Sequence, residues 1–476
     1  MFKKLKEKIL NDKAVQLLKS VEDLPECYLV GGCIRDFLND KRSCDKDIIV
    51  KTGEAEFFAK KLADNTNGYF IVLDDENKIY RVVMPDKANY FDVSAMLNDN
   101  LEDDIKRRDL TINSVVYDFQ KQEIIDIAGG IEDFKKGILR TFSLKNFEDD
   151  PLRMLRVFRF CAKYNFKPDE KICEFIKNNS DLIKNCAKER INQEIMKLFE
   201  GKYADIAIKE ADKQGLLNKI FPVVEELKRI PPNTHHHLNL FDHVTETVRQ
   251  VEINIEKAPE TIREALESQD LGQYPRRSFL KLGAFLHDIG KPDTWKIEEE
   301  TGRHRFIMHD EVGSEKVIPM LKELKFSKKQ TEYIKNLIKF HIYPSALVSQ
   351  EGVTEKAKLK FCRKIHPYTF DLIILAMSDR LSARGPAVTK EMVENNINNL
   401  TLLAEKCMKF AEEDIAPQPF LNGQEIMEIT GLKQSRELGD IIRQVYQAQL
   451  DGNVTDKISA KDYVKNIFKD KKSIQS

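Results

Sequence analysis

Short apolar runs separated by Gly, Asp, Asn or Pro fill residues 27–130 of the chain. Many of these runs are rich in β-branched or aromatic residues, which is typical of strands; examples are "CYLVGG", "DIIV", "GYFIVL", "IYRVVM", "NYFDVS" and "EIIDIA". Stretches with helical spacing, such as "EAEFFAKKLADN", stand between them. The pattern therefore predicts an α/β domain in which helices pack on a mixed sheet, and we refer to this domain as the head.

From residue 148 onward the apolar residues recur at helical spacing, as in "DPLRMLRVFRFCAKY". The Pro-Pro pair at 231–232 marks a boundary, and "DIAPQPF" at 414–420 is typical of a linker. We therefore predict a multidomain chain in which all-α parts follow the head. The predicted parts are the head at 1–140, a helical neck at 141–230, a second all-α domain at 231–400 and a small helical tail at 401–476.

The chain has 476 residues, a length that favours several domains over a single core. Its 41% hydrophobic and 33% charged residues predict a soluble globular protein, and no apolar run approaches the ~18 residues of a membrane span. Residues 1–20 predict an amphipathic basic helix that lacks the apolar region of a signal peptide. The net charge of −1 does not indicate a nucleic-acid partner, although a local basic face would be sufficient to bind one.

The eight cysteines include no CxxC pair, so the sequence suggests neither a disulfide framework nor a structural zinc site. This cysteine usage fits a reducing compartment, and we expect a cytoplasmic protein with no membrane partner. The sequence leaves the oligomeric state open.

Two carboxylates stand one residue apart in "DKDIIV", which follows the double glycine of "YLVGGCIRD". Residues two apart on a strand point to the same face, so Asp45 and Asp47 are expected to lie side by side, as Mg²⁺ ligands would. Gly31 and Gly32 would let phosphate groups approach backbone amides, and Arg35 would neutralise phosphate charge. Each signal is weak by itself, because a solvated strand end has the same pattern.

Together with later motifs, however, this stretch resembles the class II tRNA nucleotidyltransferases, which include the CCA-adding enzymes, and the bacterial poly(A) polymerases. The motifs follow in the family's order over about 27–220 and are "LVGGCIRD…DKDIIV", "LEDDIKRRDLTINSVVYD", "DIAGGIEDFKKGILR", "DDPLRMLRVFRF" and "ERINQEIMKLFEG". The resemblance implies that Asp45 and Asp47 are catalytic and hold Mg²⁺. It also implies that the second motif contacts the sugar and phosphates of the nucleotide through Arg108, Asp109 and Asn113.

The fourth motif also has a physical interpretation. Asp150, Arg153 and Arg156 are three residues apart, which predicts one shared helix face, and Arg159 continues the arginine cluster. A carboxylate accepts hydrogen bonds and a guanidinium donates them, so such a pair can read the amino group and ring nitrogen of cytosine or adenine and reject uracil and guanine. Ordinary salt bridges on an exposed helix are the alternative. In the family that the chain resembles, the first two positions act as the template for CTP and ATP, and we assign Arg156 and Arg159 to nucleotide binding.

Two departures from the family pattern are visible. Asp149 stands where the fourth motif usually has Glu. Only 14 residues separate Asp92 from Arg107, where family members that complete CCA carry a longer flexible stretch. The short form resembles enzymes that add CC and stop.

Eight of the nine histidines lie between 235 and 341. Histidines and aspartates recur in "NLFDHVTETV", "LGAFLHDIGK", "RFIMHDEVG", "IKFHIYPS" and "LAMSDRLSA". Such mixed nitrogen and oxygen ligands suit Mn²⁺, Fe²⁺ or Ni²⁺. We predict one metal at His243, His287, Asp288 and Asp379, a second ion at His309 and His341, and a lining role for His235, His236 and His237. Packed core histidines are the alternative. The region at about 235–390 resembles the HD metal-dependent phosphohydrolase domain, which implies removal of phosphates or opening of 2′,3′-cyclic phosphates at RNA ends.

We therefore expect template-independent addition of CTP, with ATP as a second candidate nucleotide, to the 3′ end of tRNA, and a chain that stops after CC. A full CCA-adding enzyme or a poly(A) polymerase is one alternative. A phosphohydrolase that uses the head only to bind RNA is another.

Overall fold

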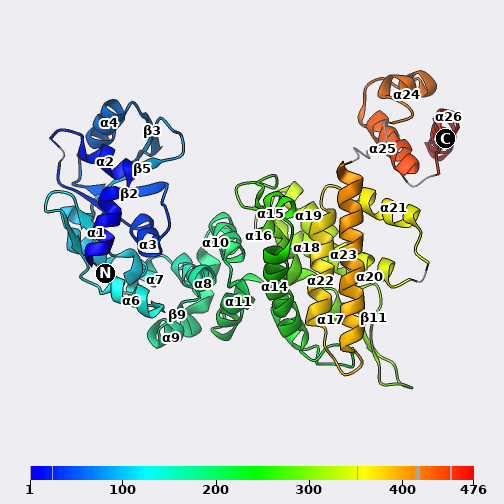
Figure 1. Ribbon diagram of the computed structural model, residues 1–476, viewed down its shortest axis with the longest axis horizontal. Coiled ribbons are helices and arrows are strands. Elements are labelled where there is room, and N and C mark those ends of the chain that lie inside the picture. Colours follow the sequence, from blue (N-terminus) through cyan, green and yellow to red (C-terminus); the bar gives the residue numbers. More distant parts are fainter. Residues whose placement is uncertain (1, 24, 351, 413–418, 451–452, 476) are drawn as a thin grey trace. The chain divides into compact units, whose positions relative to one another are not determined.

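The computed structural model describes residues 2–23, 25–350, 352–412, 419–450 and 453–475 (Figure 1). The chain divides into two compact units, one formed by Met1–Glu226 with Met320–Phe326 and the other by Leu227–Pro319 with Ser327–Ser476. The mixed-sheet head followed by helices confirms the predicted fold class. No helix among the described residues is long and apolar enough to cross a membrane.

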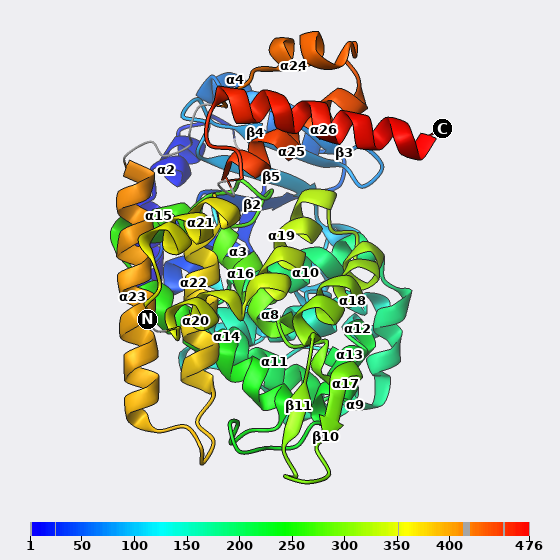
Figure 2. The same ribbon diagram turned by 90° about the vertical axis from the view of Figure 1, so that its right-hand side faces the viewer.

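A seven-stranded sheet forms the centre of the head, with strand order β3-β4-β5-β2-β1-β6-β7. Strands β2, β3, β4 and β5 of this sheet are labelled in Figure 2. Strands β2 and β5 are parallel, and every other neighbouring pair in this sheet is antiparallel. The strands are β1 (Cys27–Val30), β2 (Asp45–Val50), β3 (Tyr69–Asp74), β4 (Ile79–Val83), β5 (Tyr90–Ala95), β6 (Val116–Asp118) and β7 (Glu123–Ile125).

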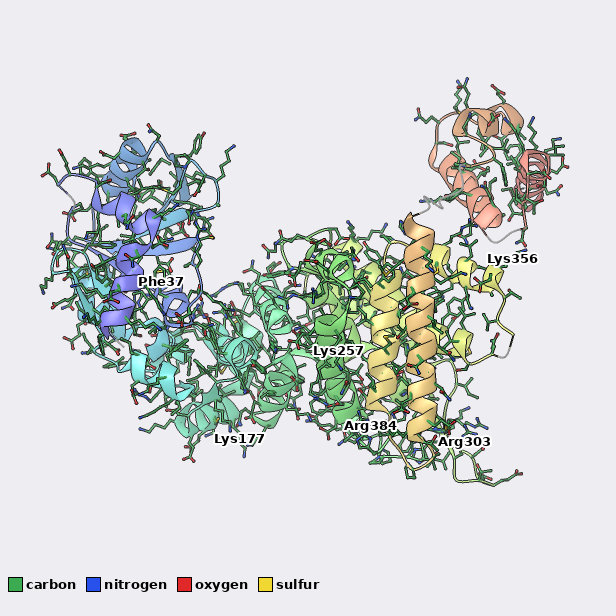
Figure 3. All side chains as sticks on the ribbon, viewed as in Figure 1. Phe37, Lys177, Lys257, Arg303, Lys356 and Arg384 are labelled. Atoms are coloured by element: carbon green, nitrogen blue, oxygen red, sulfur yellow. A yellow bond between two sulfur atoms is a disulfide. The ribbon has the colours of Figure 1, made fainter. Side chains whose placement is uncertain are left out.

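The alternation of side chains along the strands gives the sheet two different faces. One face, to which β2 contributes Ile48 and Val50, packs against the first four helices; Phe37 of α3, labelled in Figure 3, is buried in this core. The other face includes Ile49 and is covered in part by Leu101 and Ile105 of α5. The helices of the head are α1 (Phe2–Asn11), α2 (Lys13–Lys19), α3 (Gly32–Leu38), α4 (Ala55–Thr66), η1 (Leu97–Asp99), α5 (Leu101–Lys106), η2 (Thr111–Asn113) and α6 (Gly130–Lys136).

The predicted single helix over residues 1–20 is wrong in one respect. The structure has two helices there, α1 and α2, with a break at Asp12. The Asp12 side chain accepts hydrogen bonds from the backbone amides of Ala14 and Val15, so it caps the start of α2.

A helical segment completes the first unit, and its α8 packs against α10 and α11. The buried side of α8 includes Leu155, Phe158 and Ala162. The elements are β8 (Ile138–Leu139), α7 (Lys145–Asp149), α8 (Leu152–Tyr164), β9 (Lys167–Pro168), α9 (Glu170–Asn179), η3 (Ser180–Asn185), α10 (Lys188–Glu200), α11 (Ala204–Lys213), α12 (Leu217–Ile220) and α13 (Val223–Lys228).

The second unit is mainly helical, and α14 packs against α16 and α22. Its first elements are α14 (Leu240–Lys257), α15 (Glu260–Glu267), α16 (Arg276–Leu286), α17 (Lys291–Thr294), β10 (Trp295–Ile297), β11 (His304–Phe306) and α18 (His309–Glu323). The remaining elements are α19 (Lys328–Phe340), α20 (Tyr343–Val348), α21 (Glu355–Ile365), α22 (Thr369–Ser382), α23 (Lys390–Glu412), α24 (Gly423–Thr430), α25 (Arg436–Leu450) and α26 (Lys457–Gln475). The last three helices share a small core of their own, and residues 413–418 of the predicted linker lie outside the described part.

The expectation of no disulfide is corrected at one place, because Cys362 of α21 is bonded to Cys407 of α23. Their Cα atoms are 5.5 Å apart. The two cysteines are 45 positions apart in the sequence, so no local spacing rule could pair them. The six other cysteines are free thiols.

Candidate functional site

Three carboxylates lie together on the partly covered face of the sheet. Asp45 and Asp47 project from β2 to the same face as Ile49, as predicted from the period of the strand. The parallel pairing of β2 with β5 sets Asp92 directly opposite Asp47. One carboxylate oxygen from each of the three lies within 4.8 Å of the others, an arrangement that could hold a divalent cation. Asp92 was not predicted as a site residue, and its only signal in the sequence is an acidic residue in the middle of the strand "NYFDVS".

The electrostatics of this group favour a bound cation. Burial, followed by the charges of Asp47 and Asp92, raises the pKa of Asp45 to about 6. Burial also raises the pKa of Asp47, against the opposing effect of Arg108. A shared divalent cation would offset both the burial and the mutual repulsion of these carboxylates. Arg81 holds Asp92 in place through two hydrogen bonds of 2.7 Å.

The double glycine also has a structural reason. Gly31 has a φ of +77°, and a Cβ atom at this position would lie 2.6 Å from the Asp47 carboxylate. The backbone amide of Gly32 donates a hydrogen bond to the same carboxylate. The turn therefore sets the position of Asp47, whether or not it also contacts a phosphate.

Arg35 is buried in a network and does not point freely into solvent. Its Nε donates to the Tyr164 hydroxyl at 3.0 Å, its guanidinium lies 4.7 Å from the centre of the Phe160 ring, and it also donates to Asn113. Asn113 in turn donates to Asp109 at 2.8 Å. In this arrangement Arg35 braces the second motif, which is a different use from the predicted neutralisation of phosphate charge.

A cavity of about 230 Å³ lies within the first unit and is lined by Arg107, Arg108, Asp109, Asp150, Arg153 and Arg156. Buried Asp104 pairs with both Arg107 and Arg108, at 2.6 and 2.8 Å. Burial raises the pKa of Asp109, but Arg156, 2.8 Å away, and the Asn113 hydrogen bond outweigh it and lower the pKa to about 2. Four arginines against two carboxylates around one cavity suit a polyphosphate.

Asp150 does not share a helix face with Arg153 and Arg156, so this prediction is corrected. Asp150 ends α7 with an extended backbone (φ −140°, ψ 92°), and α8 begins only at Leu152. The cause is Pro151, because a proline excludes the residue before it from the helical region. Arg156 is the partner of Asp109, and Arg159 is held by Glu194 at 3.1 Å and does not line the cavity.

Asp150 nevertheless stays beside the arginines. The closest distance from its carboxylate to the Arg153 guanidinium is 4.0 Å, whereas Arg190 of α10 donates to it at 2.9 Å. Arg153 donates to the backbone carbonyls of Arg107 and Asn146. Arg190 was missed as a site residue, although it lies within the fifth motif, "ERINQEIMKLFEG".

The second unit brings all six predicted ligands of the histidine region together. His243 Nε2 lies 3.1 Å from Asp379 and 3.5 Å from Asp288. His287 Nε2 lies 3.2 Å from Asp288, and His309 and His341 approach the other oxygen of Asp288 at 3.3 and 3.6 Å. The ligands come from α14, α22, α18 and the residues that follow α16 and α19.

The orientation of the rings fits metal binding. The Nδ1 atoms of His287, His309 and His341 lie 2.8, 2.7 and 2.6 Å from backbone carbonyls, which leaves each Nε2 directed at the carboxylates. The Nε2 atoms of His243 and His287 and the Oδ1 atom of Asp288 are buried without hydrogen-bond partners, while the other oxygen of Asp288 has Lys291 at 2.6 Å. Buried polar atoms of this kind are costly unless something satisfies them, and a metal would satisfy all of them at once.

The charge balance supports the same conclusion. Burial lowers the pKa of His287, but Asp288 and Asp379 outweigh it and raise the pKa to about 10, so a positive charge is favoured at this point. Lys291 lies 2.6 Å from Asp288. Of the three consecutive histidines, His236 approaches the site, with its ring centre 4.5 Å from that of His243, while His235 and His237 are exposed.

Known proteins match both units. Family models described as "Poly A polymerase head domain", "Probable RNA and SrmB- binding site of polymerase A" and "HD domain" match residues 27–140, 165–228 and 241–384. The chain is 29% identical over 446 residues to the A-adding tRNA nucleotidyltransferase of Deinococcus radiodurans, covering 92% of this chain and 95% of the relative. It is 26% identical over 444 residues to the CC-adding tRNA nucleotidyltransferase of Thermus thermophilus, covering 92% and 93%.

Solved structures agree on the fold. A CCA-adding enzyme in an apo form aligns with a TM-score of 0.60 and 18% identity over 97% of this chain and 96% of that chain. The Thermotoga maritima CCA-adding enzyme complexed with tRNA aligns with a TM-score of 0.56 and 18% identity over 97% of both chains. The fold and the site define a nucleotidyltransferase with an attached HD domain. Over 92% of its length the chain is similar to tRNA nucleotidyltransferases, and its matched domains are a poly(A) polymerase head, the associated RNA-binding segment and an HD domain.

Proposed function

We propose that this protein adds nucleotides, beginning with CTP, to the 3′ end of tRNA without a nucleic-acid template. The observation that carries the proposal is the group of carboxylates formed by Asp45, Asp47 and Asp92, together with the arginine-lined cavity of the same unit. Arg108 connects the two, because it lines the cavity and its charge acts on Asp47. The relatives that add C or A to tRNA support the choice of substrate.

Each part of the site has a distinct task in this proposal. Mg²⁺ held by the carboxylates would supply Lewis-acid stabilisation of the charge that develops during nucleotidyl transfer. The arginines around the cavity bind and orient the triphosphate, so that its α-phosphate faces the RNA 3′-hydroxyl. Asp150 and Arg153 read the base, and Arg190 holds the Asp150 carboxylate in place.

Incubation with tRNA substrates tests the assignment. The purified protein should extend a tRNA that ends at the discriminator base when CTP is supplied, and sequencing of the products identifies what was added. Asp47→Asn serves as the inactive control. Absence of any extension with all four nucleotides and Mg²⁺ would reject the proposal, and a long A-tail would assign the protein to the poly(A) polymerases.

A second activity rests on the histidine region. We propose that His243, His287, Asp288 and Asp379 hold a transition metal such as Mn²⁺, Fe²⁺ or Ni²⁺, with His309 and His341 beside a second ion, and that the site hydrolyses phosphate esters at RNA ends. The buried Oδ1 atom of Asp288 and the buried Nε2 atoms of His243 and His287, which have no hydrogen-bond partner, support this. Elemental analysis after reconstitution, combined with an assay on RNA ending in a 2′,3′-cyclic phosphate, tests it. The cytoplasmic location stays a prediction from cysteine usage.

A further inference from the structure

Two rows of side chains cross the sheet from the carboxylates to its edge. Paired residues on neighbouring strands share a face, so each row can be followed from the register of β2, β5, β4 and β3. The first row is Asp45, Tyr90, Val83 and Tyr69; the second is Asp47, Asp92, Arg81 and Ile71. The face that carries the carboxylates therefore continues without interruption to the edge strand β3.

The outer end of these rows is apolar and open to solvent. Tyr69 is 58% exposed and Ile71 is 43% exposed, although both belong to a strand of the sheet. Phe70, between them, points to the opposite face and packs on the core under α4. We refer to Tyr69, Ile71, Val83 and Tyr90 as the edge strip.

The chemistry of the edge strip suits nucleic-acid bases. Tyr90 carries the Arg81 guanidinium over its ring at 4.1 Å, and Arg81 is already paired with Asp92. Bases stack on aromatic rings and on guanidinium groups, largely without regard to sequence. Exposed Lys41, Arg42 and Lys87 lie in the loops at the end of the sheet where β2 and β5 begin and β4 ends, next to the first row. The cations would pair with the phosphates of a single-stranded nucleic acid, and the aromatic surface would stack with its bases.

We propose that the edge strip binds the last unpaired nucleotides of the RNA and leads its 3′ end to Asp45 and Asp47. This inference rests on the proposed nucleotidyl transfer. Three spacings of about 4.8 Å separate β2 from β3, so the path is about 14 Å long and has room for a few nucleotides. An exposed edge strand can also pair with a second copy of the chain, but the exposed rings lie on the sheet face that continues to the carboxylates.

Steady-state kinetics with Tyr69→Ala and the double variant Tyr69→Ala/Ile71→Ser test the proposal. Loss of stacking should raise the KM for a tRNA that already ends in the first C, and so has two unpaired nucleotides, by roughly tenfold and leave the KM for CTP unchanged. Tyr69→Phe, which keeps the ring, should behave like the wild type. Phe57→Ala is the matched control, because Phe57 is 64% exposed on α4 of the opposite face.

Two results would overturn the inference. One is a KM for RNA within about twofold of wild type in the double variant, since stacking contributes more than this. The other is a wild-type dimer in sedimentation that becomes a monomer in Tyr69→Ala, which would assign the strip to a second copy. If the wild type transfers no nucleotide, the proposed function fails. The binding of RNA by the edge strip can still be tested in that case, because fluorescence anisotropy measures the affinity of the wild type and of the double variant for the same tRNA.

Discussion

At the scale of single residues, Asp150 has two guanidinium groups within reach. Arg190 contacts it at 2.9 Å, and Arg153 is 4.0 Å away. Because Arg190 already neutralises Asp150, the N–H groups of Arg153 that do not bond the Arg107 and Asn146 carbonyls can donate to a base while the carboxylate keeps its position. The predicted pair of base-reading residues is therefore part of a group of three. Arg153 lies in α8, Asp150 lies in the turn that precedes α8, and Arg190 lies in α10.

We expect Asp150→Ala and Arg153→Ala to lose most of the preference for CTP over UTP. Hydrogen-bond readout that leaves groups unpaired for the wrong base gives selectivity on the order of 10⁴ at best, so the ratio of kcat/KM values should fall by a large factor. Arg190→Ala should lower the ratio less, because Asp150 remains. Lys177→Ala is the control, because Lys177 is an exposed residue of α9 that does not line the cavity. An unchanged ratio in both of the first two variants would place the template elsewhere.

Asp371 gives a prediction about pH. It is buried on α22, 3.1 Å from Arg276, and accepts a hydrogen bond from Tyr333 at 2.7 Å. Burial outweighs these partners and raises its pKa from 3.8 to about 6. The folded state therefore holds more protons than the unfolded state between these two values. As pH rises through this range, the free energy of unfolding should fall.

The expected loss is about 1 kcal/mol between about pH 5 and about pH 7, measured in wild type relative to Asp371→Asn. The comparison removes the contribution of every other group that titrates equally in both proteins. Denaturant unfolding at each pH provides the measurement. A difference that stays constant or changes in the opposite direction would show that Arg276 keeps the carboxylate ionised.

At the scale of elements, α5 (Leu101–Lys106) occupies much of the stretch between Asp92 and Arg107. Asn100 caps the start of this helix through the backbone amides of Glu102 and Asp103. Ile105 is fully buried against the sheet, and buried Asp104 holds Arg107 and Arg108. A stretch anchored in this way has no free length with which to move as a lever.

We therefore expect addition to stop after two cytidines. Switching from C to A requires the pocket to accept a larger base, and a mobile segment tethered before Arg107 could drive that change in longer relatives. A tRNA lacking CCA should gain CC, and ATP should be added poorly to a tRNA that ends in CC. Efficient synthesis of CCA by the purified protein would contradict this while leaving nucleotidyl transfer in place. The similarity to both A-adding and CC-adding relatives makes this the decisive measurement.

At the scale of the whole molecule, the two candidate centres belong to different units. The carboxylates lie in Met1–Glu226, and the histidines lie in the unit that includes Leu227–Pro319. Among the residues that the structure describes, the candidate ligands of each centre all come from its own unit. Their chemistry should therefore be separable by single substitutions.

We expect Asp47→Asn to abolish nucleotide addition and to leave metal content and hydrolysis at the histidine site near wild type. Loss of a metal-held charge removes several kcal/mol of transition-state stabilisation, which is a factor of roughly 10³ or more. His287→Ala should have the reverse effect, with loss of bound transition metal but intact CTP addition. If either substitution abolished both activities while circular dichroism showed a folded chain, the centres would not be independent.

The sequence by itself determined much of this protein. The period of the strand placed Asp45 and Asp47 on one face, ordered motifs indicated the family that the chain resembles, and the histidine pattern predicted six candidate ligands that the second unit brings together. The strand prediction was possible because it depends only on neighbours in the chain. The motif and histidine predictions were possible because they depend on residue types that few other functions require. The roles of the individual site residues stay predictions until the variants are measured.

Only the tertiary structure decided which residues join the predicted ones. Asp92 reaches Asp47 through the parallel pairing of β2 with β5, and Arg190 reaches Asp150 through the packing of α10 on α8. Cys362 and Cys407 meet because α21 packs on α23. Each of these contacts joins residues at least 40 positions apart. Nothing in the local sequence around these residues marks them as partners. Hydrophobic packing of whole elements brings them together, and the periodicity of a single segment does not encode which segment will lie beside it.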